Sequence, residues 1–208
     1  MIQTRTGVKV RSDTERNRHR LIKSAARLVA SRGHEVRMTD VAEKAEVSTA
    51  TAYRHFASVD ELLQQFRYDV GLKLLEFSKK QTTTGADLLG AICSEWIRLV
   101  VKHGRAMVIT RSREGYLARL RSDAPYLTVQ ADALGPAVSS AAVALEIDDP
   151  GDEGLFLWNI LFDPREIFDL LETVGLSQSE AADRLFQTYC GALRGWSESK
   201  RAHSTSAS

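Results

Sequence analysis

The stretch Thr39–Phe56, TDVAEKAEVSTATAYRHF, has the pattern of two short helices joined by a tight turn. Thr39 is placed to cap the first helix, because its hydroxyl can accept a hydrogen bond from a free backbone N–H. Asp40 adds negative charge at the positive end of the helix dipole. Ser48 can cap the second helix in the same way. The sequence therefore predicts a helix-turn-helix, and the rest of the chain can be placed around it.

The two predicted helices have small apolar inner faces. Val41, Ala42 and Ala45 share one side of the first helix, and Ala52 and Phe56 stand one turn apart on the second. Alanines let two helices cross closely. The outer face of the second helix carries side chains that can bond base edges and phosphates in a major groove, namely Thr49, Thr51, Tyr53, Arg54 and His55. Many all-helical proteins contain polar-faced helix pairs, so the flanking sequence has to support this interpretation.

Charge is distributed unevenly along the chain. The net charge is only +1, yet residues 1–37 hold ten Lys or Arg against three Asp or Glu, so the remainder is acidic. A solvated charged helix is common, but it accounts poorly for a bias of one sign confined to one end. A basic head on an acidic body indicates that the head meets a polyanion.

Composition excludes several other classes of protein. The 208 residues are 43% hydrophobic, which is enough for a real core. Apolar runs are too short to span a bilayer, and the first residues do not resemble a signal peptide. Cys93 and Cys190 form neither a metal motif nor a disulfide framework. We therefore expect a cytoplasmic protein with no cofactor, no metal and no membrane partner. Enzyme motifs are also absent from the sequence, so we expect no catalysis.

Helical periodicity dominates the whole chain, and no useful strand pattern is present. Residues 1–12 suggest a flexible basic arm. A helix is expected from Asp13 or Thr14 to Arg32, ended by Gly33, and another from Asp60 or Glu61 to near Lys80. The later helical segments are 86–103, 105–121, 124–146, 153–175 and 178–196, and the tail from Glu198 looks unstructured.

One break is predicted inside segment 153–175. Asp163-Pro164 has the form of a cap and a first-turn proline, which would divide that segment into two helices. The predicted fold class is all-α. A three-helix head with the helix-turn-helix (residues 12–58) precedes a larger helical body (residues 59–198).

From Arg16 to Leu63 the sequence resembles the TetR (TetR/AcrR) family of bacterial transcriptional regulators. The resemblance rests on a helix ending at Gly33, Thr39 followed by VAEKA, the VS pair, the run at Thr51, Tyr53, His55 and Phe56, and ASVDELL. The later stretch SEAADRLFQTYCGALRGW is similar, more weakly, to the family's last helix. Two positions depart from the family pattern. Glu46 stands in the turn where Gly is usual, and Val59 stands where a phosphate-binding Lys often opens the fourth helix.

The resemblance implies a homodimer, commonly a repressor, whose two heads enter successive major grooves of a near-palindromic operator. It assigns Thr39, Tyr53 and His55 to phosphate contacts. Thr49, Ala50, Thr51 and Arg54 are the candidates for base contacts, because their methyl, hydroxyl and guanidinium groups suit base edges. The full set of DNA-binding candidates is Arg37, Thr39, Lys44, Ser48, Thr49, Ala50, Thr51, Tyr53, Arg54 and His55.

Family members also hold a small-molecule effector in the body, and its binding moves the heads. Aromatic and polar residues of the body are the candidates to line this site, and they suit a largely apolar effector: Trp96, Arg111, Arg113, Tyr116, Tyr126, Phe156, Trp158 and Phe162. Each, taken alone, is better explained as core or surface than as a ligand contact. The sequence does not name the effector, the operator or the regulated genes.

The last helical segments offer more apolar surface than a thin domain can bury, which favours a four-helix dimer interface. The interface candidates are Leu161, Ile167, Leu170, Leu171, Val174, Leu185, Tyr189, Leu193 and Trp196. Gly191 and Gly195, one turn apart, would permit close helix approach. The alternative is that these helices are internal core and that Gly195 marks a helix end. An alternative function also remains, namely an adaptor of the same fold that acts through a protein partner or ligand and binds DNA weakly.

Overall fold

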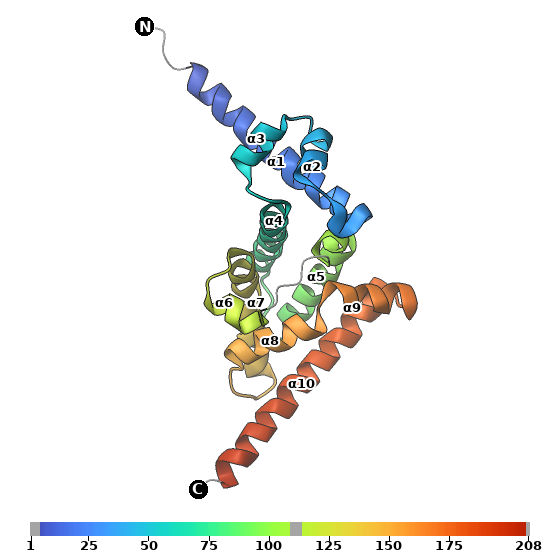
Figure 1. Cartoon of the computed structure of the whole chain (residues 1–208). Coiled ribbons are helices and arrows are strands. Elements are labelled where there is room, and N and C mark those ends of the chain that lie inside the picture. The colour runs from blue at the N-terminus through green and yellow to red at the C-terminus, as the bar shows by residue number, and fades with distance from the viewer. Residues whose placement is uncertain (1–4, 109–113, 207–208) are drawn as a thin grey trace. The chain divides into compact units, whose positions relative to one another are not determined.

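The computed structural model describes residues 5–108 and 114–206, and the side chains of residues 13–108 and 114–203. These residues form helices and connecting turns with no strand, so the all-α prediction is confirmed (Figure 1). The elements, in chain order, are α1 (Arg5–Arg32), the 3-10 turn η1 (Gly33–Glu35), α2 (Met38–Lys44), α3 (Thr49–His55), α4 (Val59–Lys79), α5 (Gly85–Met107), α6 (Tyr116–Arg121), α7 (Pro125–Ala144), α8 (Gly151–Leu161), α9 (Pro164–Phe168), the π-helical turn η2 (Asp169–Thr173) and α10 (Gln178–Ser206).

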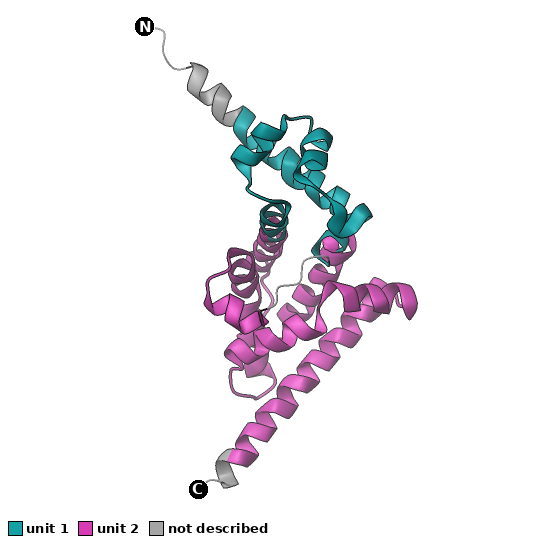
Figure 2. Ribbon diagram, viewed as in Figure 1, with its two compact units in different colours: residues 1–67, 105–111 teal, residues 68–104, 112–208 magenta. Residues whose placement is uncertain are grey.

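The chain divides into two compact units, coloured separately in Figure 2. The first unit is residues 1–67 and 105–111, and the second is residues 68–104 and 112–208. The divisions fall inside α4 and near the end of α5, not in a linker. A functional boundary at residue 58, just before α4, remains a proposal.

The first unit is built around a small core that α1, α2, α3 and the start of α4 share. Its fully buried members include Leu21, Val41, Ala52 and Leu62. Phe56 closes the core after α3, and the Arg18 guanidinium lies 5.0 Å from the centre of its ring. Arg18 also donates a 2.7 Å hydrogen bond to the side chain of Gln65 on α4. The predicted inner faces therefore do form the core that holds α2 and α3 together.

Helix α1 begins earlier than the sequence indicated. It starts at Arg5, not at Asp13 or Thr14, so the prediction of a flexible arm is wrong for residues 5–12. Residues 1–4 lie outside the described residues. Asp13 lies inside the helix and pairs with Arg16 one turn later, with 3.2 Å between the carboxylate and guanidinium atoms. An Asp that pairs with an Arg three residues later can stabilise the interior of a helix, and an Asp can equally cap the start of one. The sequence alone therefore did not distinguish these two roles for Asp13.

The second unit is centred on aromatic side chains of α5, α8 and α10. The rings of Trp158 and Phe162 stack with centroids 3.9 Å apart, and Tyr189 meets both edge-on. The indole N–H of Trp96 donates to the Phe162 carbonyl oxygen at 2.9 Å. Backbones also approach closely here, because a Cβ on Gly71 of α4 would stand 2.5 Å from the Val129 side chain of α7.

Two of the predictions for the helical segments of the second unit are wrong, and one is confirmed. Segment 105–121 is not one helix, because α5 continues to Met107 and α6 starts only at Tyr116. Segment 153–175 does divide at Asp163, whose carboxylate accepts from the Arg165 backbone N–H at 2.9 Å, so that prediction is confirmed. Helix α10 runs on to Ser206, so the prediction of an unstructured tail is wrong for residues 198–206.

Two ion pairs join the last part of α10 to residues at the start of α8 and just before it. Lys200 pairs with Glu153 at 2.5 Å, and Arg201 lies 3.7 Å from Asp148. Both acids precede or begin α8, so the end of α10 is attached to the rest of its unit. The Ser- and Ala-rich composition of the tail does not reveal these long-range pairs.

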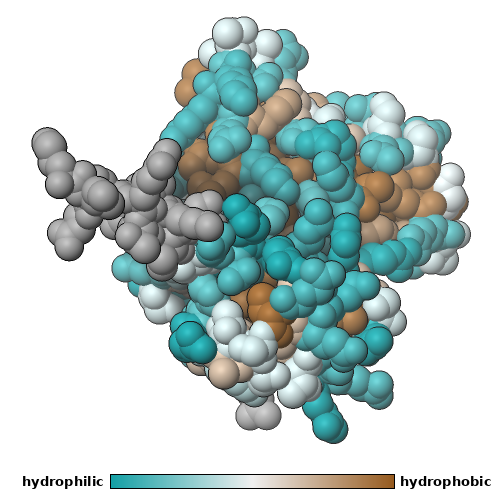
Figure 3. Space-filling view, turned by 90° about the horizontal axis from the view of Figure 1, so that it is seen from above, coloured by the Kyte–Doolittle hydropathy of each residue, from teal (hydrophilic) through white to brown (hydrophobic). Residues whose placement is uncertain are grey.

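The surface seen in Figure 3 is mostly hydrophilic, with hydrophobic patches between the polar side chains. The large apolar side chains that stand exposed are Tyr53, Val101, Val143, Ile160, Val174 and Trp196. Within the described residues, every helix is too short or too polar to cross a lipid bilayer.

Candidate nucleic-acid interface and the groove of the second unit

The first turn of α2 is capped by a residue other than the predicted one. Arg37 holds the N-cap position, and the Asp40 carboxylate accepts from its backbone N–H at 2.8 Å. Thr39 lies inside the helix with an exposed side chain. The prediction that Thr39 caps α2 is therefore wrong, because the helix begins at Met38, two residues before the start that a Thr39 cap would give. Its hydroxyl remains available at the surface.

The turn between α2 and α3 places Glu46 in the left-handed region, with φ of 54°. Two backbone bonds close the turn: Glu46 N–H donates to the Glu43 carbonyl, and Val47 N–H to that of Ala42, each at 3.0 Å. This is the helix ending that usually has glycine at its left-handed position. The Glu46 carboxylate also pairs with Arg20 of α1. The turn therefore keeps its geometry despite the departure from glycine, with a new contact to the neighbouring helix.

Ser48 caps α3 as predicted. Its hydroxyl oxygen accepts from the Thr51 backbone N–H at 3.1 Å and shares a hydrogen bond with the Thr51 hydroxyl at 2.8 Å. Ala52 is fully buried beneath the helix, which fixes the opposite face outward. The cap and the buried alanine together set the direction of every outer side chain.

The outer face of α3 is open to solvent. Thr49, Ala50 and Arg54 are exposed, and Tyr53 is 56% exposed, which is unusual for a tyrosine on a helix of a packed unit. Thr51 and His55 are half-buried at the edges of this face. The structure thus places the predicted set on one accessible surface.

Cations flank that surface without opposing charge. Arg37, Lys44 and Arg54 are exposed, and none of them forms an ion pair within the described residues. An exposed cation without an acidic partner loses little when it meets a phosphate, since no existing pair has to break. The electrostatics of this face therefore suit a polyanion.

Comparison with known proteins identifies this unit. The family model described as "Bacterial regulatory proteins, tetR family" matches residues 21–66, which run from the buried part of α1 through α2 and α3 into α4. Residues 21–66 therefore carry the helix-turn-helix domain that is typical of tetR-family regulators. A search of curated proteins gives no significant match.

Solved structures of bacterial regulators share the fold along most of the chain. FadR, described as a fatty acid degradation regulator from Bacillus halodurans, aligns with a TM-score of 0.62 at 13% identity over 85% of this chain and 96% of its own. A putative regulator from Rhodococcus sp. gives 0.57 at 20% identity, covering 85% and 98%. One from Streptomyces coelicolor gives 0.55 at 17% identity, covering 83% and 80%. At these identities the likeness shows the fold alone.

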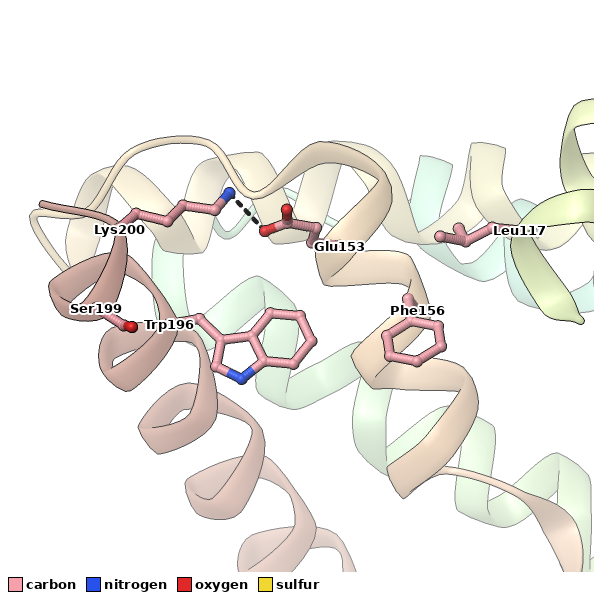
Figure 4. Close-up of a pocket in the computed structure, with 6 residues that line it drawn as sticks. All are labelled: Leu117, Glu153, Phe156, Trp196, Ser199 and Lys200. Atoms are coloured by element: carbon pink, nitrogen blue, oxygen red, sulfur yellow. Dashed lines mark ion pairs between the residues drawn. The ribbon is translucent and has the colours of Figure 1, made fainter. Parts of the chain in front are cut away.

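The second unit carries an open groove of about 470 Å³ at its surface, between α6, α8 and α10 (Figure 4). Phe156 and Trp196 form an aromatic wall with ring centroids 6.2 Å apart. The Glu153–Lys200 ion pair lies at one side. The lining residues are Leu117, Glu153, Phe156, Trp196, Ser199 and Lys200. The volume falls in the range of small-molecule sites.

The predicted effector residues are not gathered in this groove. Phe156 lines it, whereas Trp96, Tyr116, Trp158 and Phe162 are buried in the interior. Tyr126 is half-buried, and its hydroxyl oxygen accepts from Arg119 at 2.9 Å. Arg111 and Arg113 lie outside the described residues. Leu117, Glu153, Ser199 and Lys200 were missed, since no local sequence signal marks residues that line a groove between distant helices.

The predicted dimer residues divide into two sets. Ile167, Leu185, Tyr189 and Leu193 are buried within their own unit, so they cannot also meet a second copy in this structure. Leu161, Leu170 and Leu171 are half-buried, and Val174 and Trp196 are exposed. Gly191 and Gly195 lie on the exposed side of α10 with open space beyond the position of a Cβ. Only part of the predicted set therefore remains available for an interface.

Proposed function

We propose that this regulator binds a near-palindromic operator as a homodimer, represses transcription, and is released from DNA by a small-molecule effector held in its second unit. The exposed outer face of α3 carries the proposal. A tyrosine that is 56% exposed contributes nothing evident to the fold, and the neighbouring Arg54 forms no ion pair with any described residue, so this surface favours contact with another molecule.

Within that face, the side chains suit different parts of a duplex. Tyr53, His55 and Thr39 offer hydroxyl and imidazole groups for phosphate oxygens, which fixes the position of the helix. Arg54 can donate two hydrogen bonds to a guanine. The hydroxyl of Thr51 already bonds Ser48, so its methyl group is the part that suits a thymine methyl.

The remaining candidates supply charge, local order and close approach. Arg37 and Lys44 add cations beside the face, and Ser48 holds the first turn of α3 in place. Thr49 and Ala50 are exposed at that first turn, where a recognition helix contacts bases first.

A dimer would double the number of bases that one short helix can read. The exposed strip of α10 that contains Gly191 and Gly195 favours this assembly, because two helices can approach closely where side chains are absent. Val174 and Trp196 add exposed apolar surface, and Leu161, Leu170 and Leu171 can contribute their exposed parts.

Effector release requires a ligand that favours one arrangement of the two heads over another, so that effector and DNA weaken each other's binding by the same factor. The groove beside Phe156 and Trp196 is the surface feature that suits such a ligand. A largely apolar effector fits its aromatic wall. The structural neighbour FadR is described as a regulator of fatty acid degradation, which is in keeping with an apolar effector here.

The test is a gel shift on the DNA that flanks the chain's own gene. Arg54→Ala should weaken binding by roughly tenfold or more, since a good base contact is worth about 1–3 kcal/mol. Arg184→Ala is the matched control, because this arginine is also exposed but lies on α10 in the second unit. Tyr53→Ala should weaken binding as well. Equal affinities for wild type and all three variants would reject the interface and favour an adaptor that acts through a protein partner.

A further inference from the structure

Two helices supply most of the groove in the second unit, and each contributes one face (Figure 4). Glu153 and Phe156 stand one turn apart on α8. Trp196, Ser199 and Lys200 share one side of α10, because their positions follow the i, i+3 and i+4 spacing of a helix. The groove therefore has a polar part and an aromatic part in a fixed order along both helices.

The two parts lie next to each other across the groove. Lys200 of α10 pairs with Glu153 of α8 at 2.5 Å, and Trp196 of α10 meets Phe156 of α8. On each helix the polar and the aromatic residue are three or four positions apart, which is about 5–6 Å along the axis. One small molecule is long enough to contact both parts.

The aromatic part suits a flat ring. The planes of Phe156 and Trp196 differ by 25°, with ring centroids 6.2 Å apart. Rings that are nearly parallel turn their faces in nearly the same direction, so a flat aromatic ring can stack against both. Trp196 is 39% exposed, so the protein leaves part of its ring uncovered. A saturated, puckered ring would contact these faces less well.

The polar part offers a hydrogen-bond acceptor directly beside a donor. The Glu153 carboxylate accepts and the Lys200 ammonium donates, and both side chains reach solvent. An ion pair this exposed adds little to stability, so a ligand can insert between its partners at small cost. An amide edge matches it, because the N–H can donate to Glu153 while the carbonyl accepts from Lys200. Both bonds involve a charged partner, which strengthens them.

We propose that this groove binds a flat aromatic molecule with an amide-type edge, its ring stacked on Phe156 and Trp196 and its edge bonded to Glu153 and Lys200. This inference rests on the proposed function, in which the molecule is the effector. It adds two requirements to an apolar effector, namely a flat ring and a neighbouring donor and acceptor.

The test uses three bicyclic probes of similar size on the full chain without DNA. Carbostyril is a flat lactam with the amide edge, N-methylcarbostyril lacks the N–H, and fully hydrogenated carbostyril keeps the edge but is not flat. Dissociation constants come from NMR titrations that follow the indole N–H signals of the tryptophans. Carbostyril should bind about threefold to tenfold more tightly than either of the other two probes.

The same spectra locate the probe. The indole signal of Trp196 should move when an aromatic ring stacks on it, whereas the signals of Trp96 and Trp158, which are buried and do not line the groove, should move least. Trp196→Leu assigns the signal and should weaken carbostyril binding by about threefold to tenfold. Trp196→Phe keeps an aromatic ring and should retain most of the affinity.

The polar contacts are tested one at a time. Glu153→Leu should abolish the preference for carbostyril over N-methylcarbostyril, because only the N–H distinguishes these probes. Lys200→Met should weaken both, since both use the carbonyl oxygen. Arg201→Met is the matched control: Arg201 is also an exposed, ion-paired residue of α10, 3.7 Å from Asp148, but it does not line the groove. Its dissociation constants should equal those of the wild type.

Several results would overturn the inference. They are equal affinity for the three probes, no binding of any probe, a shift of Trp96 or Trp158 without one of Trp196, and a loss of affinity in Arg201→Met as large as in Lys200→Met. Binding that weakens as the protein concentration rises would also overturn it, because a second copy of the chain would then cover the groove.

The outcome is separable from that of the regulator. Selective carbostyril binding that leaves the affinity for DNA unchanged would reject only the proposed release by an effector. Selective DNA binding by a protein whose groove does not prefer carbostyril would reject only this inference.

Discussion

Replacing Ser48 with alanine should destabilise α3 without touching the core. In the structure, the Ser48 hydroxyl accepts from the Thr51 backbone N–H at 3.1 Å and bonds the Thr51 hydroxyl at 2.8 Å. Alanine removes both contacts. Loss of an N-cap of this kind costs about 1 kcal/mol, within a range of roughly 0.5–2 kcal/mol. Ser48 is exposed, so water can reach the freed N–H, which keeps the cost near the middle of that range.

For a chain of this length, a cost of about 1 kcal/mol lowers the thermal midpoint by about 2–4 °C. The assay is urea and thermal unfolding followed by both far-ultraviolet circular dichroism and tryptophan fluorescence. The three tryptophans, Trp96, Trp158 and Trp196, all lie in the second unit, so fluorescence reports on that unit and circular dichroism on the whole chain. The Ser48→Ala loss should therefore appear first in the dichroism signal.

Thr39→Ala is the matched control, since sequence alone assigned a cap to Thr39 as well. The structure instead places Arg37 at the N-cap of α2, where its backbone N–H donates to the Asp40 carboxylate, and leaves Thr39 exposed inside the helix. Thr39→Ala should change stability by less than about 0.5 kcal/mol. A loss for Thr39→Ala as large as that for Ser48→Ala would refute the capping assignment.

Three further changes test other parts of the account. Glu46→Gly should relieve about 1 kcal/mol of left-handed backbone strain, and it should lose about 0.2–1 kcal/mol from the exposed ion pair with Arg20. The urea midpoint should therefore rise slightly, and the rise should grow with salt because salt screens the ion pair that the variant lacks. A lower midpoint at every salt concentration would contradict this prediction. Burial, followed by the charge of Lys73, lowers the pKa of His103 from 6.5 to about 4. Between these two pH values the imidazole is protonated in the unfolded chain but not in the folded one, so stability should fall as pH drops from 6.5 toward 4. His103→Gln should flatten that part of a plot of unfolding midpoint against pH. Val59→Lys should add one phosphate contact, so the slope of log affinity against log salt concentration should steepen by about 0.9 in DNA titrations. The same change should lower stability, because Val59 packs on the core of the first unit. An unchanged slope would place residue 59 away from phosphate.

The periodic features of the sequence were enough to predict the fold class and the inner faces of the first unit. Ala52 and Phe56 are buried where the spacing placed them, and the left-handed Glu46 occupies the predicted turn. Asp163-Pro164 also caps and opens α9 as its local pattern indicated. These features depend on a few neighbouring residues, which is why sequence reasoning could find them.

Features that depend on distant partners escaped prediction. The end of α10 is helical where Lys200 and Arg201 pair with acids some 50 residues earlier in the chain. Tyr189 and Leu193 have the apolar spacing of an interface, but the structure buries them inside their own unit. An apolar helix face looks the same in sequence whether its own chain or a second copy covers it. The groove beside Phe156 depends on the same kind of long-range placement.

The most direct test of the central claim, that the outer face of α3 reads a DNA sequence, is a selection of binding sites from random duplex DNA with the purified protein at two salt concentrations. The account predicts an enriched inverted repeat, with half-sites about one helical turn apart, that is retained at the higher salt. Binding with no preferred sequence that vanishes as salt rises would contradict it, because only the basic charge of the first unit would then be at work.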